Sequence, residues 1–221
     1  MIILNITVEG FSEELFVKDI LTPHLWQFNI LVQVRKVLTN RKLRARGGVV
    51  SYLKFKNDIQ TWFKESPKAY HTSLIDLYGL DTEFPGFLET KKLQPYPRIL
   101  EMERRLAEDL KFRKFIPYIS LHEFEALLFS EPETMQNWLG LYSRLPEGCF
   151  ETIRQKAPDK NPELINGGNT TSPSKRIEEV CASYDKVTDG VLILKEIGLE
   201  RIRQHCKHFD EWLTKLEKLK E

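Results

Sequence analysis

Three acidic residues each stand at the end of a β-rich segment of the chain. The acids are Glu9 after residues 2–8, Asp76 near the end of residues 73–77, and Glu123 just after residues 115–121. Carboxylates gathered in one place repel each other unless a cation joins them. Hard oxygen ligands of this kind suit Mg²⁺ or Mn²⁺. If the fold brings the three segment ends to one edge, the pattern predicts a divalent-metal site.

Each of these residues also has a structural explanation. A glutamate before a glycine in a turn, taken alone, is more often a solvated loop residue than a ligand, and Asp76 is equally a cap for the turn that follows it. Glu123 and its neighbour Glu125 suit the positive end of a helix dipole. His122 titrates near neutral pH and is a candidate general acid or base, with a buried or capping histidine as the alternative. The coincidence of three segment ends favours the joint site.

Basic residues that could bind phosphate occur in two clusters. Arg44 and Arg46 belong to a basic stretch just before Gly47-Gly48, and Lys175 and Arg176 lie at a predicted helix start. Backbone N–H groups at a helix start favour anions, so both clusters are candidate phosphate or nucleic-acid contacts. The alternative for both is an ordinary solvated face.

The elements that must position these residues alternate along the first 130 positions. Strand patterns cover residues 2–8, 30–37, 73–77 and 115–121, and helical patterns lie between them, the first ending at Pro23. This alternation predicts an α/β fold with about four strands, mainly parallel and flanked by helices. Ligands of such sheets bind beyond the carboxyl ends of the strands. We expect an α/β core over residues 1–130 and a helical region packed on it over residues 131–221.

Composition limits the class of protein. The chain has 221 residues and a formal net charge of +1, which excludes a globally basic nucleic-acid coat but not a local basic face. Its three scattered cysteines form neither a disulfide framework nor a zinc motif, which favours the reducing cytoplasm. No apolar run is long enough to cross a membrane. Phosphate-loop, dinucleotide-binding and hydrolase-elbow motifs are absent from the sequence.

Several short motifs, taken together, carry a resemblance to a known family. The motifs are Val8-Glu9-Gly10-x-x-Glu13-Glu14, Arg46-Gly47-Gly48, Leu74-Ile75-Asp76-x-Tyr78-Gly79-Leu80, Phe84-Pro85-Gly86, His122-Glu123-Phe124-Glu125, Asn161-Pro162-Glu163, Pro173-Ser174-Lys175-Arg176, Tyr184-x-Lys186 and Cys206-x-His208-Phe209. The chain resembles the Toprim (topoisomerase–primase) domain, and more closely a bacterial family of uncharacterised Toprim-like proteins. The resemblance covers nearly the whole chain.

The resemblance implies metal-dependent phosphodiester chemistry. Glu9 matches the Toprim glutamate, a metal ligand or general acid/base, and Asp76 matches the first acid of the DxD motif, a Mg²⁺ ligand. This sequence has Tyr78 at the second acidic position, which leaves room for a one-metal or a non-catalytic site. Glu123 is the favoured further ligand; the secondary candidates are Glu13, Asp81 and Glu125, together with Tyr78 itself.

Two functions follow from this resemblance. The first is a Mg²⁺-dependent nuclease that acts on DNA or RNA as the effector of a phage-defence system of the abortive-infection type. Such family members are often encoded beside an AAA- or SMC-like ATPase, which is the expected partner. The alternative is a non-catalytic, degenerate Toprim scaffold that binds the ATPase.

Overall fold

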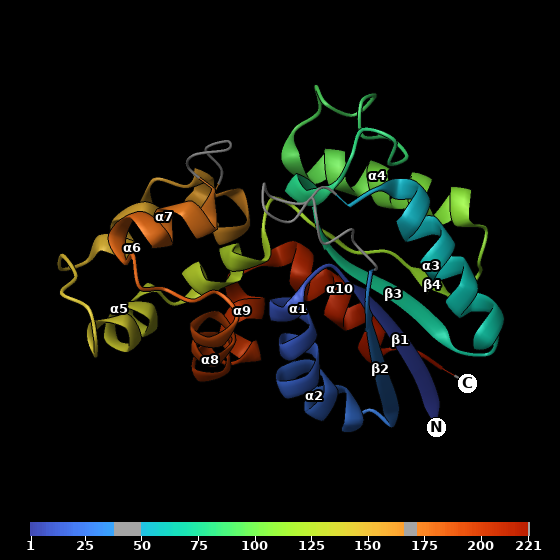
Figure 1. Cartoon of the computed structure of the whole chain (residues 1–221), viewed down its shortest axis with the longest axis horizontal. Coiled ribbons are helices and arrows are strands. Elements are labelled where there is room, and N and C mark those ends of the chain that lie inside the picture. The colour runs from blue at the N-terminus through green and yellow to red at the C-terminus, as the bar shows by residue number, and fades with distance from the viewer. Residues whose placement is uncertain (38–49, 166–171, 221) are drawn as a thin grey trace. The chain divides into compact units, whose positions relative to one another are not determined.

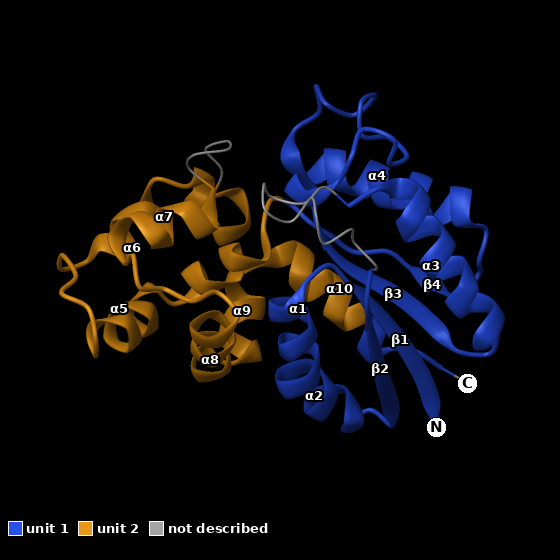
Figure 2. Ribbon diagram, in the orientation of Figure 1, with its two compact units in different colours: residues 1–121, 216–221 blue, residues 122–215 orange. Residues whose placement is uncertain are grey.

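The computed structural model describes residues 1–37, 50–165 and 172–220 (Figure 1). The chain divides into two compact units, one made of residues 1–121 and 216–221 and the other of residues 122–215 (Figure 2). None of the helices in the described ranges combines the length and the apolar run that a bilayer crossing requires.

The first unit is built on a parallel sheet of five strands. They are β1 (Ile2–Val8), β2 (Ile30–Lys36), β3 (Tyr70–Asp76), β4 (Phe115–Ile116) and β5 (Ile119–Ser120). The order is β2-β1-β3-β4, and β5 also pairs with β3. The predicted α/β fold is therefore confirmed. Five strands replace about four because the predicted strand 115–121 is split into two short ones that both pair with β3.

The central strands are buried on both faces. All residues from Leu4 to Val8 in β1 and from His71 to Ile75 in β3 are buried. Side chains alternate between the two faces of a strand, so a run of consecutive buried residues requires cover on both sides. Helices provide that cover: α3 and α4 lie together on one side, while α1 and α2 lie beside β2 (Figure 1).

The first helical segment continues further than its sequence predicts. It runs through α1 (Phe11–Phe16), the π-helix η1 (Val17–Leu21) and α2 (Thr22–Trp26). The expectation that Pro23 ends the helix is wrong, because Pro23 occupies the first turn of α2. The π-helix just before it shifts the hydrogen-bond pattern from i→i+4 to i→i+5, and the chain continues into α2 across this change.

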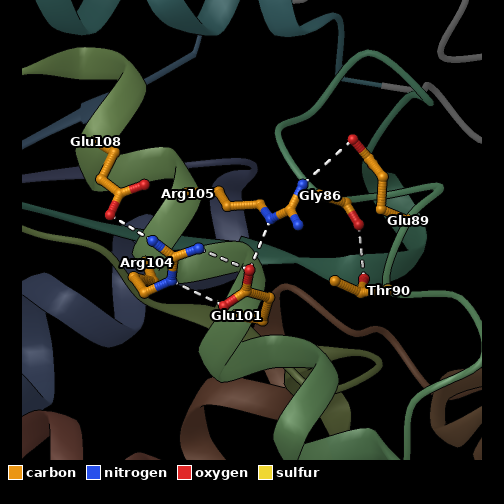
Figure 3. Close-up of polar contacts among 7 residues, drawn as sticks. All are labelled: Gly86, Glu89, Thr90, Glu101, Arg104, Arg105 and Glu108. Carbon is orange, nitrogen blue, oxygen red and sulfur yellow. Dashed lines mark hydrogen bonds and ion pairs between the residues drawn. The ribbon is translucent and has the colours of Figure 1, made fainter.

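The remaining helices of the first unit are α3 (Tyr52–Glu65), the short 3₁₀ helix η3 (Leu77–Gly79) and α4 (Pro95–Leu110). Ion pairs join the loop before α4 to the helix itself (Figure 3). Arg105 contacts Glu89 of the loop at 3.3 Å and Glu101 of α4 at 2.7 Å. Arg104 and Arg105 together lower the pKa of Glu101 to about 2. Exposed pairs of this kind contribute little stability.

Gly86 allows the sharp turn in this loop. Its φ of +85° lies in the left-handed region that favours glycine, and an added Cβ would approach Arg105 Cδ to 2.9 Å. The Gly86 carbonyl accepts a hydrogen bond from Thr90 Oγ1 at 2.6 Å (Figure 3). The loop after the third strand is therefore a defined structure.

The second unit is helical. Its elements are η4 (Phe124–Ser130), α5 (Pro132–Gly140), α6 (Cys149–Gln155), η5 (Pro158–Lys160), η6 (Pro162–Leu164), α7 (Pro173–Val180), α8 (Thr188–Ile197), α9 (Leu199–His205) and most of α10 (Lys207–Glu217). Phe129, Phe150, Ile177 and Leu194 are fully buried. The unit thus has an apolar core of its own.

Candidate functional site

Glu9 and Asp76 meet at the carboxyl ends of two neighbouring strands. β1 and β3 are parallel, and Val8 pairs with Leu74, so each acid follows its strand at the same edge of the sheet. The backbone N–H of Asp76 donates to Glu9 Oε2 at 3.4 Å. Both residues are half-buried. Of the acids expected at this edge, the structure brings this pair together within the first unit.

Gly79 leaves the space that the Glu9 carboxyl group occupies. A Cβ at Gly79 would lie 2.5 Å from Glu9 Oε2, 2.6 Å from Oε1 and 2.8 Å from Cδ. Real Cβ atoms do not approach other atoms this closely, so any larger residue displaces the carboxylate. Tyr78, at the second acidic position of the motif, is partly exposed in the same 3₁₀ turn.

The two glutamates at the start of α1, Glu13 and Glu14, have different surroundings. Glu13 is buried, and its Oε2 lies 2.8 Å from the position that a Cβ of Gly10 would take. Glu14 accepts hydrogen bonds from Lys18 and Lys36, which lower its pKa. Glu14 is therefore held in ion pairs, whereas Glu13 packs against the turn that carries Glu9.

Asp81 caps a helix. Its Oδ2 accepts the backbone N–H of Tyr52, the first residue of α3, at 3.0 Å. Its Oδ1 accepts the N–H of Glu83, also at 3.0 Å. Both carboxylate oxygens are thus used in local structure, and the chain fixes the start of α3 close to the β3 end.

Arg98 is a cation near this edge that the sequence did not single out. Burial lowers its pKa, and the neighbouring Tyr78 opposes that shift. Its guanidinium lies 5.2 Å from the ring centroid of Phe87. Within the described ranges its Nε is buried and has no hydrogen-bond partner.

His122, Glu123 and Glu125 belong to the second unit. His122 is buried, and so is Glu125, which lies 3.5 Å from Lys186 Nζ. Glu123 Oε2 accepts the N–H of Ser174 in the first turn of α7 at 3.0 Å. Glu123 thus supports the start of α7, a helix distant from it in the sequence, and its role as a metal ligand stays a prediction.

Of the four predicted phosphate-binding residues, the structure describes two. Lys175 is exposed and pairs with Glu178 one turn along α7, and Arg176 is half-buried in the same helix. Arg44 and Arg46 lie outside the described residues.

The acids do not form a complete metal cage. Among the described residues, no group of three or more His, Cys, Asp and Glu side chains could hold a metal ion. Glu9 and Asp76 still fit Mg²⁺, because this ion usually takes one or two protein carboxylates and completes its shell with water and substrate phosphates. The three cysteines are free thiols.

Two solved structures are similar to this chain over nearly its whole length. The C-terminal region of the Burkholderia pseudomallei OLD protein has a TM-score of 0.50 at 15% identity, with coverage of 97% of this chain and 98% of that one. This likeness supports the Toprim-like fold expected from the sequence. The C-terminal region of the Xanthomonas campestris pv. campestris OLD protein gives a TM-score of 0.39 at 17% identity, covering 96% and 93%.

No curated protein matches the chain. A family model described as a domain of unknown function, DUF4276, matches residues 8–217. That range includes both acids of the strand edge and the whole second unit. The chain therefore belongs to the DUF4276 family.

Proposed function

We propose that this chain is a Mg²⁺- or Mn²⁺-dependent nuclease that hydrolyses phosphodiester bonds in DNA or RNA. The observation that carries the proposal is the meeting of Glu9 and Asp76 at adjoining carboxyl ends of parallel strands. Ligand sites of open α/β sheets lie at this edge. The OLD-like fold supports the proposal, since it is the fold expected from the Toprim resemblance.

Glu9 and Asp76 are the residues that would hold the metal. A divalent ion there would polarise a phosphate oxygen and activate water. The chain's own contribution is to place the two carboxylates: the Asp76 N–H holds Glu9 Oε2, and Gly79 leaves room for the carboxyl group. Arg98 adds a positive charge beside Tyr78 that would attract a phosphate.

The proposed nuclease would need a partner protein to position it on nucleic acid. A net charge of +1 gives little general attraction for nucleic acid, because strong binding requires several phosphate contacts. We therefore expect an AAA- or SMC-like ATPase to position the chain as the effector of a cytoplasmic phage-defence pair. His122 as general acid or base and Glu123 as a further carboxylate remain part of the proposal, tested through H122Q and E123Q.

The test is a cleavage assay on plasmid, single-stranded DNA and RNA with Mg²⁺, Mn²⁺ or EDTA. We expect metal-dependent cleavage that falls about 100-fold or more in Glu9→Gln and in Asp76→Asn, because each removes a charged oxygen ligand. Glu14→Gln is the matched control, since Glu14 lies in the same segment but pairs with Lys18 and Lys36.

Two results would contradict the nuclease. One is metal-dependent cleavage that persists in both Glu9→Gln and Asp76→Asn. The other is a folded wild-type protein that binds Mg²⁺ no better than millimolar and cleaves nothing even with the ATPase present. The second result would favour the scaffold function, which Tyr78 at the second acidic position also supports.

A further inference from the structure

A cavity of about 420 Å³ lies at the other end of the strands from Glu9 and Asp76. It is lined by residues that begin β1 and precede or begin β3, including Ile3, Ala69 and Tyr70. Lys220 also lines it, because the C-terminal segment of the first unit returns to this end of the sheet (Figure 1). The whole cavity therefore belongs to one unit.

Three lysines, Lys68, Lys114 and Lys220, line this cavity. In the parts of the chain that the structure describes, none of them forms an ion pair with a carboxylate. Like charges that share a cavity repel each other unless an anion neutralises them. The lysine arrangement therefore favours an anionic ligand with more than one negative charge.

Two of the lysines are held in place by contacts other than ion pairs. Lys114 Nζ donates to the carbonyl of Lys68 at 2.9 Å and lies 4.8 Å from the ring centroid of Tyr70. Tyr70 Oη donates to the carbonyl of Lys220 at 3.0 Å. These contacts join the three basic segments, and none of them brings a carboxylate to a lysine ammonium group.

The rest of the cavity lining is largely apolar. It includes Met1, Ile3 and Ala69, and Ile3 keeps 40% of its surface exposed. A bare phosphate would leave this surface wet, whereas a ligand with a ring would cover it. The volume also lies in the range of roughly 300–1,000 Å³ that is usual for small-molecule sites.

We propose that this cavity binds a free nucleotide that carries two or three phosphates, with the phosphates on the lysines and the base or sugar against the apolar wall. The site is separate from the acidic edge and goes beyond the proposed nuclease function. The lysines contact the phosphates directly, so nucleotide binding here requires no divalent ion. It also does not depend on the proposed nuclease activity.

The test is isothermal titration calorimetry of the full chain with ATP in EDTA. We expect ATP to bind and Lys68→Gln and Lys114→Gln each to weaken it about tenfold or more, because each removes one charge contact. Lys92→Gln is the matched control, since Lys92 is exposed in the loop before α4 and lies outside the cavity. Adenosine and inorganic tripolyphosphate should both bind at least about tenfold more weakly than ATP.

Three outcomes would overturn this proposal: no ATP binding by the wild type, unchanged binding in both lysine variants, or tripolyphosphate binding as tightly as ATP. Thermal unfolding of each variant shows whether lost binding reflects lost folding. Glu9→Gln should bind ATP normally, so failure of the nuclease proposal and failure of this one are distinguishable.

Discussion

At the scale of single residues, the position of Glu9 depends on a glycine 70 positions away in the sequence. The Glu9 carboxyl group lies against the backbone of Gly79 and accepts the Asp76 N–H. Carboxylates that act together must be held in a narrow range of positions. The absence of a side chain at Gly79 is thus a functional requirement of the proposed site, and not only a property of the turn.

The first prediction concerns Gly79→Ala. The three atoms nearest to its Cβ would all belong to the end of the flexible Glu9 side chain, so we expect the fold to survive and the carboxylate to move. Metal-dependent cleavage should fall about tenfold or more, with the unfolding temperature within a few degrees of wild type.

Gly140→Ala is the control for that measurement, because a Cβ at Gly140 meets nothing within 4 Å. It should keep full activity and be neutral or stabilising by up to about 1 kcal/mol, since alanine favours helix. Equal activity in Gly79→Ala and wild type would show that Glu9 needs no fixed position.

At the scale of elements, acids from distant parts of the chain support helix starts. Asp81 accepts from the first turn of α3, Glu123 from that of α7 and Glu163 from that of α10. The first N–H groups of a helix have no partner within the helix, and a carboxylate also complements the helix dipole. These contacts fix where the helices begin.

Glu163 provides the sharpest test of this capping. It is buried, and its two oxygens accept the N–H groups of His208 and Phe209 at 2.9 and 3.0 Å. Glu163→Gln replaces one oxygen with an NH₂ group that cannot accept. We expect the free energy of unfolding to fall by about 1–3 kcal/mol, as measured by urea denaturation.

Glu179→Gln is the matched substitution, because Glu179 is exposed in α7. It should change the unfolding free energy by less than about 0.5 kcal/mol. A similar small effect in Glu163→Gln would mean that α10 does not depend on this cap.

At the scale of the whole molecule, each unit contains a histidine whose charged form is disfavoured. His71 is fully buried beneath Trp62 and Phe63, and burial lowers its pKa. His205 lies beside Arg154 in the second unit, and burial together with Arg154 lowers its pKa as well. Both side chains fold as neutral imidazoles.

These two histidines predict a loss of stability in mild acid. An unfolded histidine has a pKa near about 6.5, so below that pH the unfolded chain binds protons that the folded chain does not. The free energy of unfolding should therefore fall between pH 7.5 and 5.5. Each histidine contributes up to about 1.4 kcal/mol per pH unit below its unfolded pKa.

Urea titrations at pH 7.5, 6.5 and 5.5 test this prediction. His205→Gln removes one titrating group and should flatten the decline. A stability that stays constant or rises on acidification would contradict the neutral state of these histidines in the fold.

The sequence by itself determined the strand and helix pattern around the acidic edge. Short β-rich runs, such as the one from residue 2 to 8, mark strands, and the acids that follow them lie at the carboxyl edge of any parallel sheet. The continuation of the first helical segment past Pro23, by way of the π-helix Val17–Leu21, and the split of residues 115–121 into two strands were missed, because both depend on local bonding that residue type does not specify.

Only the tertiary structure decided what each acid contacts. Asp81, Glu123 and Glu163 cap helices through bonds to residues 29, 51 and 46 positions away. The lysine cavity likewise joins residues 68, 114 and 220. Periodicity records only a residue's own neighbourhood along the chain, whereas a hydrogen bond or a shared cavity depends on which distant segments the packing brings within a few ångströms. For this reason the sequence predicts that Glu9 and Asp76 lie at one edge of the sheet, whereas only the folded structure shows which groups each carboxylate contacts.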